Sequence, residues 1–262
     1  ASMKNIILFI LLLLCSVTVS AYTQQSVYDF DIKHWGSSDG LSSNSVRAVS
    51  QDNQGYIWLG TLYGLNRLDG AHFEHFTTQT HRHLASNSVT RLLHDSEGYL
   101  WVGTKSGLSG IDPNTLLVER YQILSEVTAI IEVRPVEFWV AADHLYRVSQ
   151  GNVRRVEQVL GQVSQLEQVG DQVWVTGAEQ LFRINLNGNV KNYPLPLELR
   201  QTPLYDLYWS EGQLHLAGES GFYHLEDSGD IKKCQLPDQN NTAVYKLLKD
   251  SRGNSWISAH RK

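Results

Sequence analysis

The sequence has 262 residues, of which 42% are hydrophobic, and a formal net charge of −5 at pH 7. This length allows one large domain or two small ones, each with a hydrophobic core. The negative charge and the lack of a basic run exclude nucleic acid and anionic membrane surfaces as main partners. Twelve Tyr, seven Trp and seven Phe beside a single Met favour β-sheets over long helices.

The first predicted element is an export signal. An apolar run at residues 6–14 follows Lys4, is too short to span a bilayer comfortably, and leads into small residues up to Ala21. We therefore expect a signal peptide over residues 1–21 and a mature domain over residues 22–262. An uncleaved membrane anchor is the alternative.

A single strand is expected at residues 28–35, ahead of the first repeat. This segment precedes residues 40–42 just as the apolar segment 73–76 precedes residues 84–86. It has no partner strands of its own before it. We expect it to be an outer strand that completes the last sheet of a closed ring.

The remainder of the chain is a repeat. Residues 42–61 read SSNSVRAVSQDNQGYIWLGT and recur at residues 85–104 as ASNSVTRLLHDSEGYLWVGT. A third copy, TAVYKLLKDSRGNSWIS, occupies residues 242–258, and weaker copies lie between. Units of 35 to 43 residues result if these positions are equivalent: Trp58, Trp101, Trp139, Trp174, Leu214 and Trp256. A period of this length is typical of four-stranded propeller blades.

Each unit contains four short apolar runs separated by turn residues, which predicts antiparallel strands. In the first unit these strands are expected at residues 46–50, 56–60, 65–68 and 73–76. The fold class is therefore all-β: a β-propeller of four-stranded antiparallel blades, with about five complete blades and part of a sixth. We interpret it as a truncated seven-bladed ring.

Two kinds of residue recur with the repeat and are expected to be structural. The repeated Trp is predicted to be buried between neighbouring sheets, with a sugar-stacking platform as the alternative. Asp52, Asp95 and Asp250 recur at the first turn of their units. We expect each carboxylate to accept hydrogen bonds from backbone N–H groups of its own turn, rather than to act as a catalytic acid.

The unit from Val46 to Asp69, with its D-x-x-G-x-x-W-x-G-T-x-x-G-L pattern, resembles the two-component regulator propeller repeat. The resemblance is strong in the first two units, fair in the last and poor between them. It implies the extracytoplasmic part of a bacterial hybrid histidine kinase or a related diguanylate cyclase receptor. Such a receptor would place this chain in the periplasm, linked to the inner membrane through a region C-terminal to it.

Residues that could carry out chemistry are scattered in this sequence. His72, His75, His81 and His83 gather between the first two units, but their spacing does not suit a shared metal site. No Gly-x-Ser-x-Gly elbow occurs. After signal removal Cys234 is the only cysteine, so an intrachain disulfide is impossible. We predict no catalytic residues, no metal site and no cofactor.

Binding residues are expected on the loops that join the second strand to the third, and the fourth to the next unit. These loops emerge on one face, and several of their residues differ from unit to unit. The candidate ligand-binding residues are Tyr63, Arg82, Lys105, Asp143 and His144. Departure from a repeat also occurs in surface loops that bind nothing.

The sequence therefore predicts a periplasmic sensing module that is not itself an enzyme. Its expected partners are a small molecule, with a carbohydrate as a candidate from the resemblance, a periplasmic protein, or a second copy forming a homodimer. The alternative is a propeller lyase acting on a streptogramin antibiotic or a pectic oligosaccharide. Such an enzyme needs a convergent His or Glu base and often a metal ion.

Overall fold

A computed structural model describes residues 33–159, 161–234, 242–249 and 255–261. The chain divides into two units, residues 1–35 and 36–262, and the described strands all lie in the second. No helix in the described part has the length and apolar character needed to cross a membrane. The predicted signal peptide, Asp250 and most of the predicted strand at 28–35 lie outside the described residues.

The described strands form five four-stranded antiparallel sheets and one two-stranded sheet, in chain order. We call them blades one to six. Blade one contains β1 (Val46–Gln51), β2 (Ile57–Thr61), β3 (Leu65–Leu68) and β4 (Phe73–Phe76); blade two contains β5 (Val89–His94), β6 (Leu100–Thr104), β7 (Gly107–Ile111) and β8 (Val118–Arg120). Blade three contains β9 (Ala129–Arg134), β10 (Glu137–Ala141), β11 (Leu145–Ser149) and β12 (Asn152–Arg155). Blade four contains β13 (Val163–Val169), β14 (Gln172–Gly177), β15 (Gln180–Asn185) and β16 (Val190–Pro194). Blade five contains β17 (Leu204–Ser210), β18 (Gln213–Gly218), β19 (Gly221–Leu225) and β20 (Ile231–Lys233), and blade six contains β21 (Thr242–Lys249) and β22 (Ser255–Arg261).

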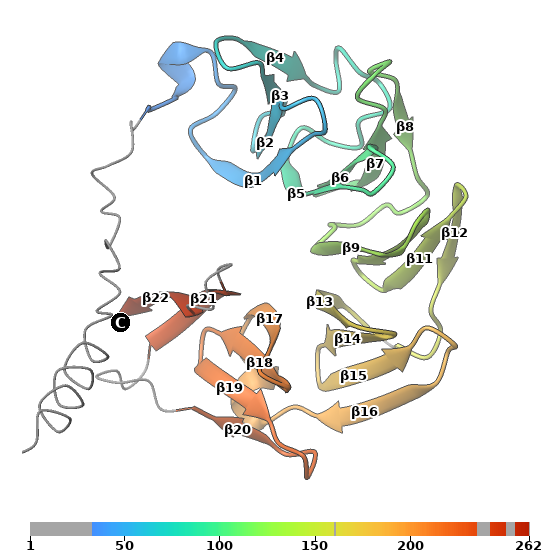
Figure 1. The fold of residues 1–262 in the computed structure, drawn as a ribbon, viewed down its shortest axis with the longest axis vertical. Coiled ribbons are helices and arrows are strands. Elements are labelled where there is room, and N and C mark those ends of the chain that lie inside the picture. The colour runs from blue at the N-terminus through green and yellow to red at the C-terminus, as the bar shows by residue number, and fades with distance from the viewer. Residues whose placement is uncertain (1–32, 160, 235–241, 250–254, 262) are drawn as a thin grey trace, which may run out of the picture. The chain divides into compact units, whose positions relative to one another are not determined.

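The predicted count of five complete blades and part of a sixth is confirmed. Only two short helical elements interrupt the described strands, η2 (Ser37–Asp39) and α2 (Leu197–Arg200). Within the unit 36–262, the first strand of each blade lies beside the first strand of the next, from β1 through β5, β9, β13 and β17 to β21. The blades therefore succeed one another around an arc, each with its first strand innermost (Figure 1). A ring of seven blades stays a prediction.

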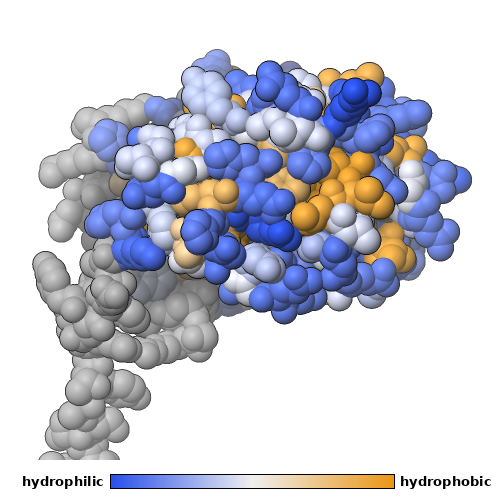
Figure 2. Space-filling model, turned by 90° about the horizontal axis from the view of Figure 1, so that it is seen from above, coloured by the Kyte–Doolittle hydropathy of each residue, from blue (hydrophilic) through white to orange (hydrophobic). Residues whose placement is uncertain are grey.

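Hydrophobic cores lie between the blades rather than within them. Separate buried clusters join blade one to two, two to three, three to four, four to five, and five to six. The face shown in Figure 2 is mostly hydrophilic, with hydrophobic patches between the polar residues. Because each sheet turns apolar side chains toward both neighbours, a blade is stable only as part of the row.

The repeated Trp residues form part of these cores. Trp58 is fully buried, and Trp101, Trp139 and Trp174 expose at most 5% of their surface. Each belongs to a cluster shared with the following blade. The predicted wedge role is confirmed for these four residues.

Two positions in the Trp series differ from the prediction. Trp256 on β22 is 60% exposed, because among the described strands of blade six there is no third strand to cover it. In blade five the equivalent residue is His215 rather than Leu214. His215 pairs with His224 as Trp101 pairs with Gly110, and it precedes Gly218 by three residues just as Trp174 precedes Gly177.

Glycine in the second strand permits the close approach of successive blades. A Cβ on Gly60 would lie 2.4 Å from Cγ1 of Val89, and one on Gly103 would lie 2.7 Å from Cγ1 of Val127. Val89 and Val127 are fully buried. The Gly of the repeated Gly-Thr pair therefore leaves the space that the following blade's valine fills.

Candidate functional site

The five predicted ligand-binding residues lie on the expected loops, but most of them stand apart. Tyr63 follows β2 and is 69% exposed, and Lys105 follows β6. Arg82 lies in the loop between β4 and β5. Asp143 and His144 connect β10 to β11. Among these five described residues, hydrogen bonds or ion pairs join only Asp143 and His144.

Asp143 is the centre of a small polar group. Its carboxylate accepts hydrogen bonds from the hydroxyls of Ser125 and Tyr146, and His144 Nδ1 lies 3.1 Å from Oδ2. Burial acts to raise the pKa of Asp143, but the hydrogen bonds from Ser125, Tyr146 and His144 outweigh it and lower the pKa below its usual value. Burial, and then the contact with Asp143, raises the pKa of Tyr146. These neighbours hold the Asp143 carboxylate in its ionised form.

Three of the four clustered histidines, His72, His75 and His81, have separate environments. His75 Nε2 contacts the Gly40 carbonyl at 2.6 Å, and His81 stacks on Phe76 with ring centroids 4.5 Å apart. His72 lies 3.7 Å from Asp69 at an exposed turn. In the described part of the chain, no group of three or more His, Cys, Asp or Glu side chains could hold a metal ion.

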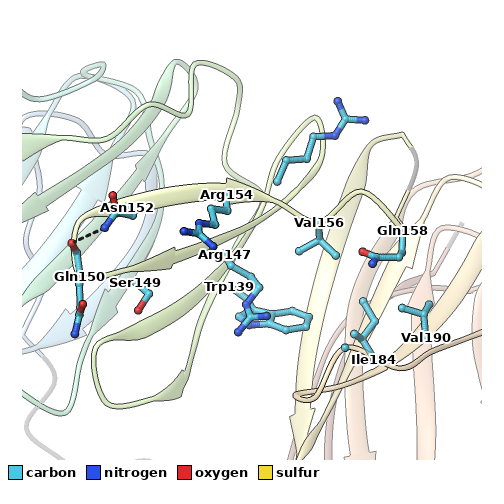
Figure 3. Close-up of a pocket in the computed structure, with 12 residues that line it drawn as sticks. Trp139, Arg147, Ser149, Gln150, Asn152, Arg154, Val156, Gln158, Ile184 and Val190 are labelled. Carbon is cyan, nitrogen blue, oxygen red and sulfur yellow. Dashed lines mark hydrogen bonds between the residues drawn. The ribbon is translucent and has the colours of Figure 1, made fainter.

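A cavity of about 470 Å³ lies between blades three and four, and it is the best-formed candidate site. This cavity is lined by Trp139 on β10, Arg147 on β11 and Arg154 on β12, and across from them by Ile184 on β15 and Val190 on β16. Figure 3 shows Arg147 beside Trp139, with Ile184 and Val190 across from them on blade four. The cavity combines an apolar wall with guanidinium groups, so it offers a ligand both apolar contact and positive charge.

The two arginines sit on adjacent strands in direct cross-strand register. Arg147 is neutralised by Glu137, whose Oε1 lies 2.6 Å from Nη2, and its guanidinium lies 5.7 Å from the Trp139 ring centre. Arg154 has no hydrogen bond or ion pair with any residue that the structure describes. An anionic group bound beside Arg154 would supply the counter-charge that Arg147 already has in Glu137.

The cavity lies at the opposite edge of the blades from the predicted ligand-binding residues, whose role stays a prediction. The cavity is bordered by the turn between β11 and β12, whereas the predicted residues lie on the loops from second to third strands. The available signal was the Arg154-Arg155 pair on an outer strand, where blade one has Glu74. That signal depends on a register that only the structure supplies.

The comparisons with known proteins agree with the repeat pattern. The family model described as "Two component regulator propeller" matches residues 40–63 and 83–106. Histidine kinase P4 of Formosa agariphila is 39% identical over 72 residues, which are 28% of this chain and 5% of that protein. The chain therefore spans a small part of this curated relative.

Solved propellers share the fold. The extracellular domain of a protein assigned to the hybrid two-component systems of B. thetaiotaomicron has a TM-score of 0.67 at 16% identity, covering 88% of this chain and 36% of that one. A second such extracellular domain gives a TM-score of 0.58 at 18% identity and covers 86% and 40%. Virginiamycin B lyase of Staphylococcus aureus has a TM-score of 0.65 at 13% identity and covers 82% and 77%. At these identities the similarity shows the fold alone.

The family match falls on the first and second strands of blades one and two, where the Asp-turn, the buried Trp and the Gly-Thr pair recur. The same blade architecture continues through blade five and into blade six with diverged sequence. The chain is thus a β-propeller protein that carries two-component regulator propeller repeats.

Proposed function

We propose that this chain is the extracytoplasmic sensing part of a bacterial signal-transduction receptor, and that its signal is a small molecule bound between blades three and four. The family of its repeats supports a sensory role. The observation that carries the proposal is the preformed cavity, in which Arg154 lies opposite Arg147 and has no ion-pair partner among the described residues. No catalytic step is part of it.

The side chains define the chemistry of the ligand. Arg154 and Arg147 favour a carboxylate or sulfate, because guanidinium groups donate paired hydrogen bonds to planar anions. Trp139, Ile184 and Val190 favour an apolar or flat ring face. A small organic anion, such as an acidic sugar, combines both properties.

The position of the cavity provides a route from binding to a signal. Its walls come from two successive blades, which are also joined by a shared hydrophobic cluster and by hydrogen bonds such as that from Gln168 Nε2 to the Val133 carbonyl at 3.1 Å. A ligand that bridges Arg154 to Ile184 and Val190 would stabilise one spacing of these blades over others. In the receptor, that change would pass along the row of blades toward the membrane.

Thermal unfolding of the 262-residue chain with matched sugars tests the proposal. Glucuronate and galacturonate are compared with glucose and galactose, which lack only the carboxylate. We expect the acids alone to raise the melting temperature, and Arg154→Gln to abolish the increase. Arg134→Gln is the control, because Arg134 lies on β9, outside the cavity lining, and pairs with Glu137 at 3.8 Å. A response to the neutral sugars that persists in Arg154→Gln would contradict the assigned site.

A further inference from the structure

Blade one contains a complete cation site built from its own residues. Trp58 on β2 pairs across strands with Arg67, and Arg67 pairs with Glu74 on β4. Arg67 Nη2 lies 2.6 Å from Glu74 Oε2, and the guanidinium lies 4.5 Å from the Tyr56 ring centre and 5.6 Å from that of Trp58. Two aromatic rings and a carboxylate thus surround one positive charge.

Blade two keeps the aromatic residues and the carboxylate but has no cation. Trp101 pairs with Gly110, and Gly110 pairs with Glu119. Tyr99 follows the Asp-turn just as Tyr56 does. Glu119 is therefore the counterpart of Glu74, and Gly110 stands where Arg67 would be. Blades three and four have Arg147 and Arg183 at this position, each within 5.7 Å of its Trp ring centre.

The side chains of blade two have adjusted to the glycine. A Cβ on Gly110 would lie 2.3 Å from Cε1 of Tyr99 and 3.2 Å from Cε2 of Tyr121, so both tyrosines lean over it. Their hydroxyls donate to Glu119 Oε2, each at 3.4 Å. These long hydrogen bonds replace the 2.6 Å ion pair of blade one. Glu119 thus keeps a negative charge that no side-chain cation neutralises among the described residues.

A cavity of about 430 Å³ opens beside this group, between blades two and three. Four aromatic residues line it: Trp101, Tyr99, Tyr121 and Phe138. The ring centroids of the last three lie 4.3 to 5.5 Å from that of Trp101. Glu119 and three further carboxylates also line it, and no Lys, Arg or His does. Burial, and then the charge of Glu119, raises the pKa of Tyr121 to about 12, so its hydroxyl stays a neutral donor near pH 7.

We infer that this cavity binds the guanidinium or ammonium group of a small organic cation, which takes the role that Arg67 has in blade one. The aromatic faces supply cation–π attraction and Glu119 supplies the charge-assisted hydrogen bond. This site is separate from the arginine-lined cavity of blades three and four, so either can exist without the other. Together the two cavities would let neighbouring blade boundaries bind ligands of opposite charge.

Propylguanidinium and its neutral isostere propylurea are the probes, titrated into the 262-residue chain and followed by ligand-detected NMR. We expect saturable binding of propylguanidinium and none of propylurea. Glu119→Gln should weaken the binding about tenfold, as loss of a charge-assisted hydrogen bond does. Glu74→Gln is the matched control on blade one and should leave the affinity unchanged, because Arg67 already occupies that site.

A second variant supplies the missing charge internally. Gly110→Arg should place a guanidinium beside Glu119 and abolish binding, while the melting curve reports whether the chain still folds. Equal binding of propylurea, an affinity unaltered in Glu119→Gln, or an equal loss in Glu74→Gln would each overturn the inference. The Glu119→Gln result decides the matter even if Gly110→Arg does not fold, since Glu119 is exposed and its replacement leaves the core intact.

Discussion

The carboxylate of Asp52 accepts a hydrogen bond from the indole Nε1 of Trp58 at 2.8 Å, and both side chains are buried. The other oxygen accepts the backbone N–H groups of Gln54 and Tyr56 at 3.0 Å. Asp95 makes the three equivalent hydrogen bonds in blade two, with the backbone N–H groups of Glu97 and Tyr99 and the indole of Trp101. The turn residue predicted from the sequence therefore also anchors the core residue six positions later.

This double role predicts that Asp52→Asn destabilises the chain although the two side chains have the same shape. The single oxygen of an amide can accept hydrogen bonds either from the turn N–H groups or from the indole N–H, but not from both. The NH2 group of the amide then faces the remaining N–H donor, and neither has an acceptor. We expect a loss of about 2 kcal/mol, as for a buried polar group left without a partner. Urea unfolding measures it, with Asp69→Asn as control, since Asp69 caps an exposed turn and contacts no Trp. Equal losses in the two variants would contradict the anchoring role.

The unequal burial of the repeated Trp residues predicts unequal costs of truncation. Trp139→Ala should cost about 3–5 kcal/mol, because the ring is almost fully enclosed between blades three and four. Trp256→Ala should cost much less, because most of that ring is already in solvent. Chemical denaturation of both variants gives the comparison. A cost for Trp256→Ala as large as that for Trp139→Ala would show that its ring is covered in solution.

The contact between Gly60 and Val89 predicts coupled mutations. Gly60→Ala alone should destabilise by about 1–3 kcal/mol, because the added methyl collides with the valine across the blade boundary. Val89→Ala alone leaves a cavity, and the double variant should be more stable than the sum of the two losses predicts. A double-mutant cycle by urea unfolding measures the coupling. Strict additivity would mean that the blades separate enough to accept the methyl.

His215 predicts a dependence of stability on pH. Burial first, and then the nearby His224, lowers the pKa of His215 below 6.5. The unfolded chain therefore binds a proton more readily than the folded one, so stability is complete above pH 6.5 and declines as pH falls below that value. His215→Phe keeps the stacking on Phe222, whose ring centroid is 5.3 Å away. Between pH 8 and 5.5 the variant should lose less stability than the parent chain, and an equal loss would disprove the assignment.

Much of the fold could be predicted from the sequence because the repeat constrains it strongly. The Asp-turns, the strand-forming runs and the regular Trp spacing each indicate the same four-stranded unit. The fifth Trp position is harder to assign from the sequence, because no Trp marks it and the spacing allows either Leu214 or His215. The signal that separates them is Gly218, which follows His215 by three residues as Gly177 follows Trp174.

The candidate sites could not be predicted, because they depend on which residues face each other across strands. Loop variability led to Tyr63, Arg82 and Lys105, which the structure leaves apart. The informative residues, Arg154 and Glu119, lie on outer strands and acquire meaning only once Arg147 and Gly110 are known to be opposite them. Trp174 shows the same limit: its turn lacks the anchoring Asp, and its Nε1 has no partner in the described residues.

The third-strand residue opposite the Trp position has a wider consequence. It is Arg67, Gly110, Arg147 and Arg183 opposite the four Trp residues and His224 opposite His215 in blade five, while the blade geometry stays the same. A substitution there changes the charge of one gap and leaves the hydrophobic clusters of the others untouched. Ligand preference can therefore change at one blade boundary at a time. Proteins with this fold can then acquire new specificities while remaining folded at every step.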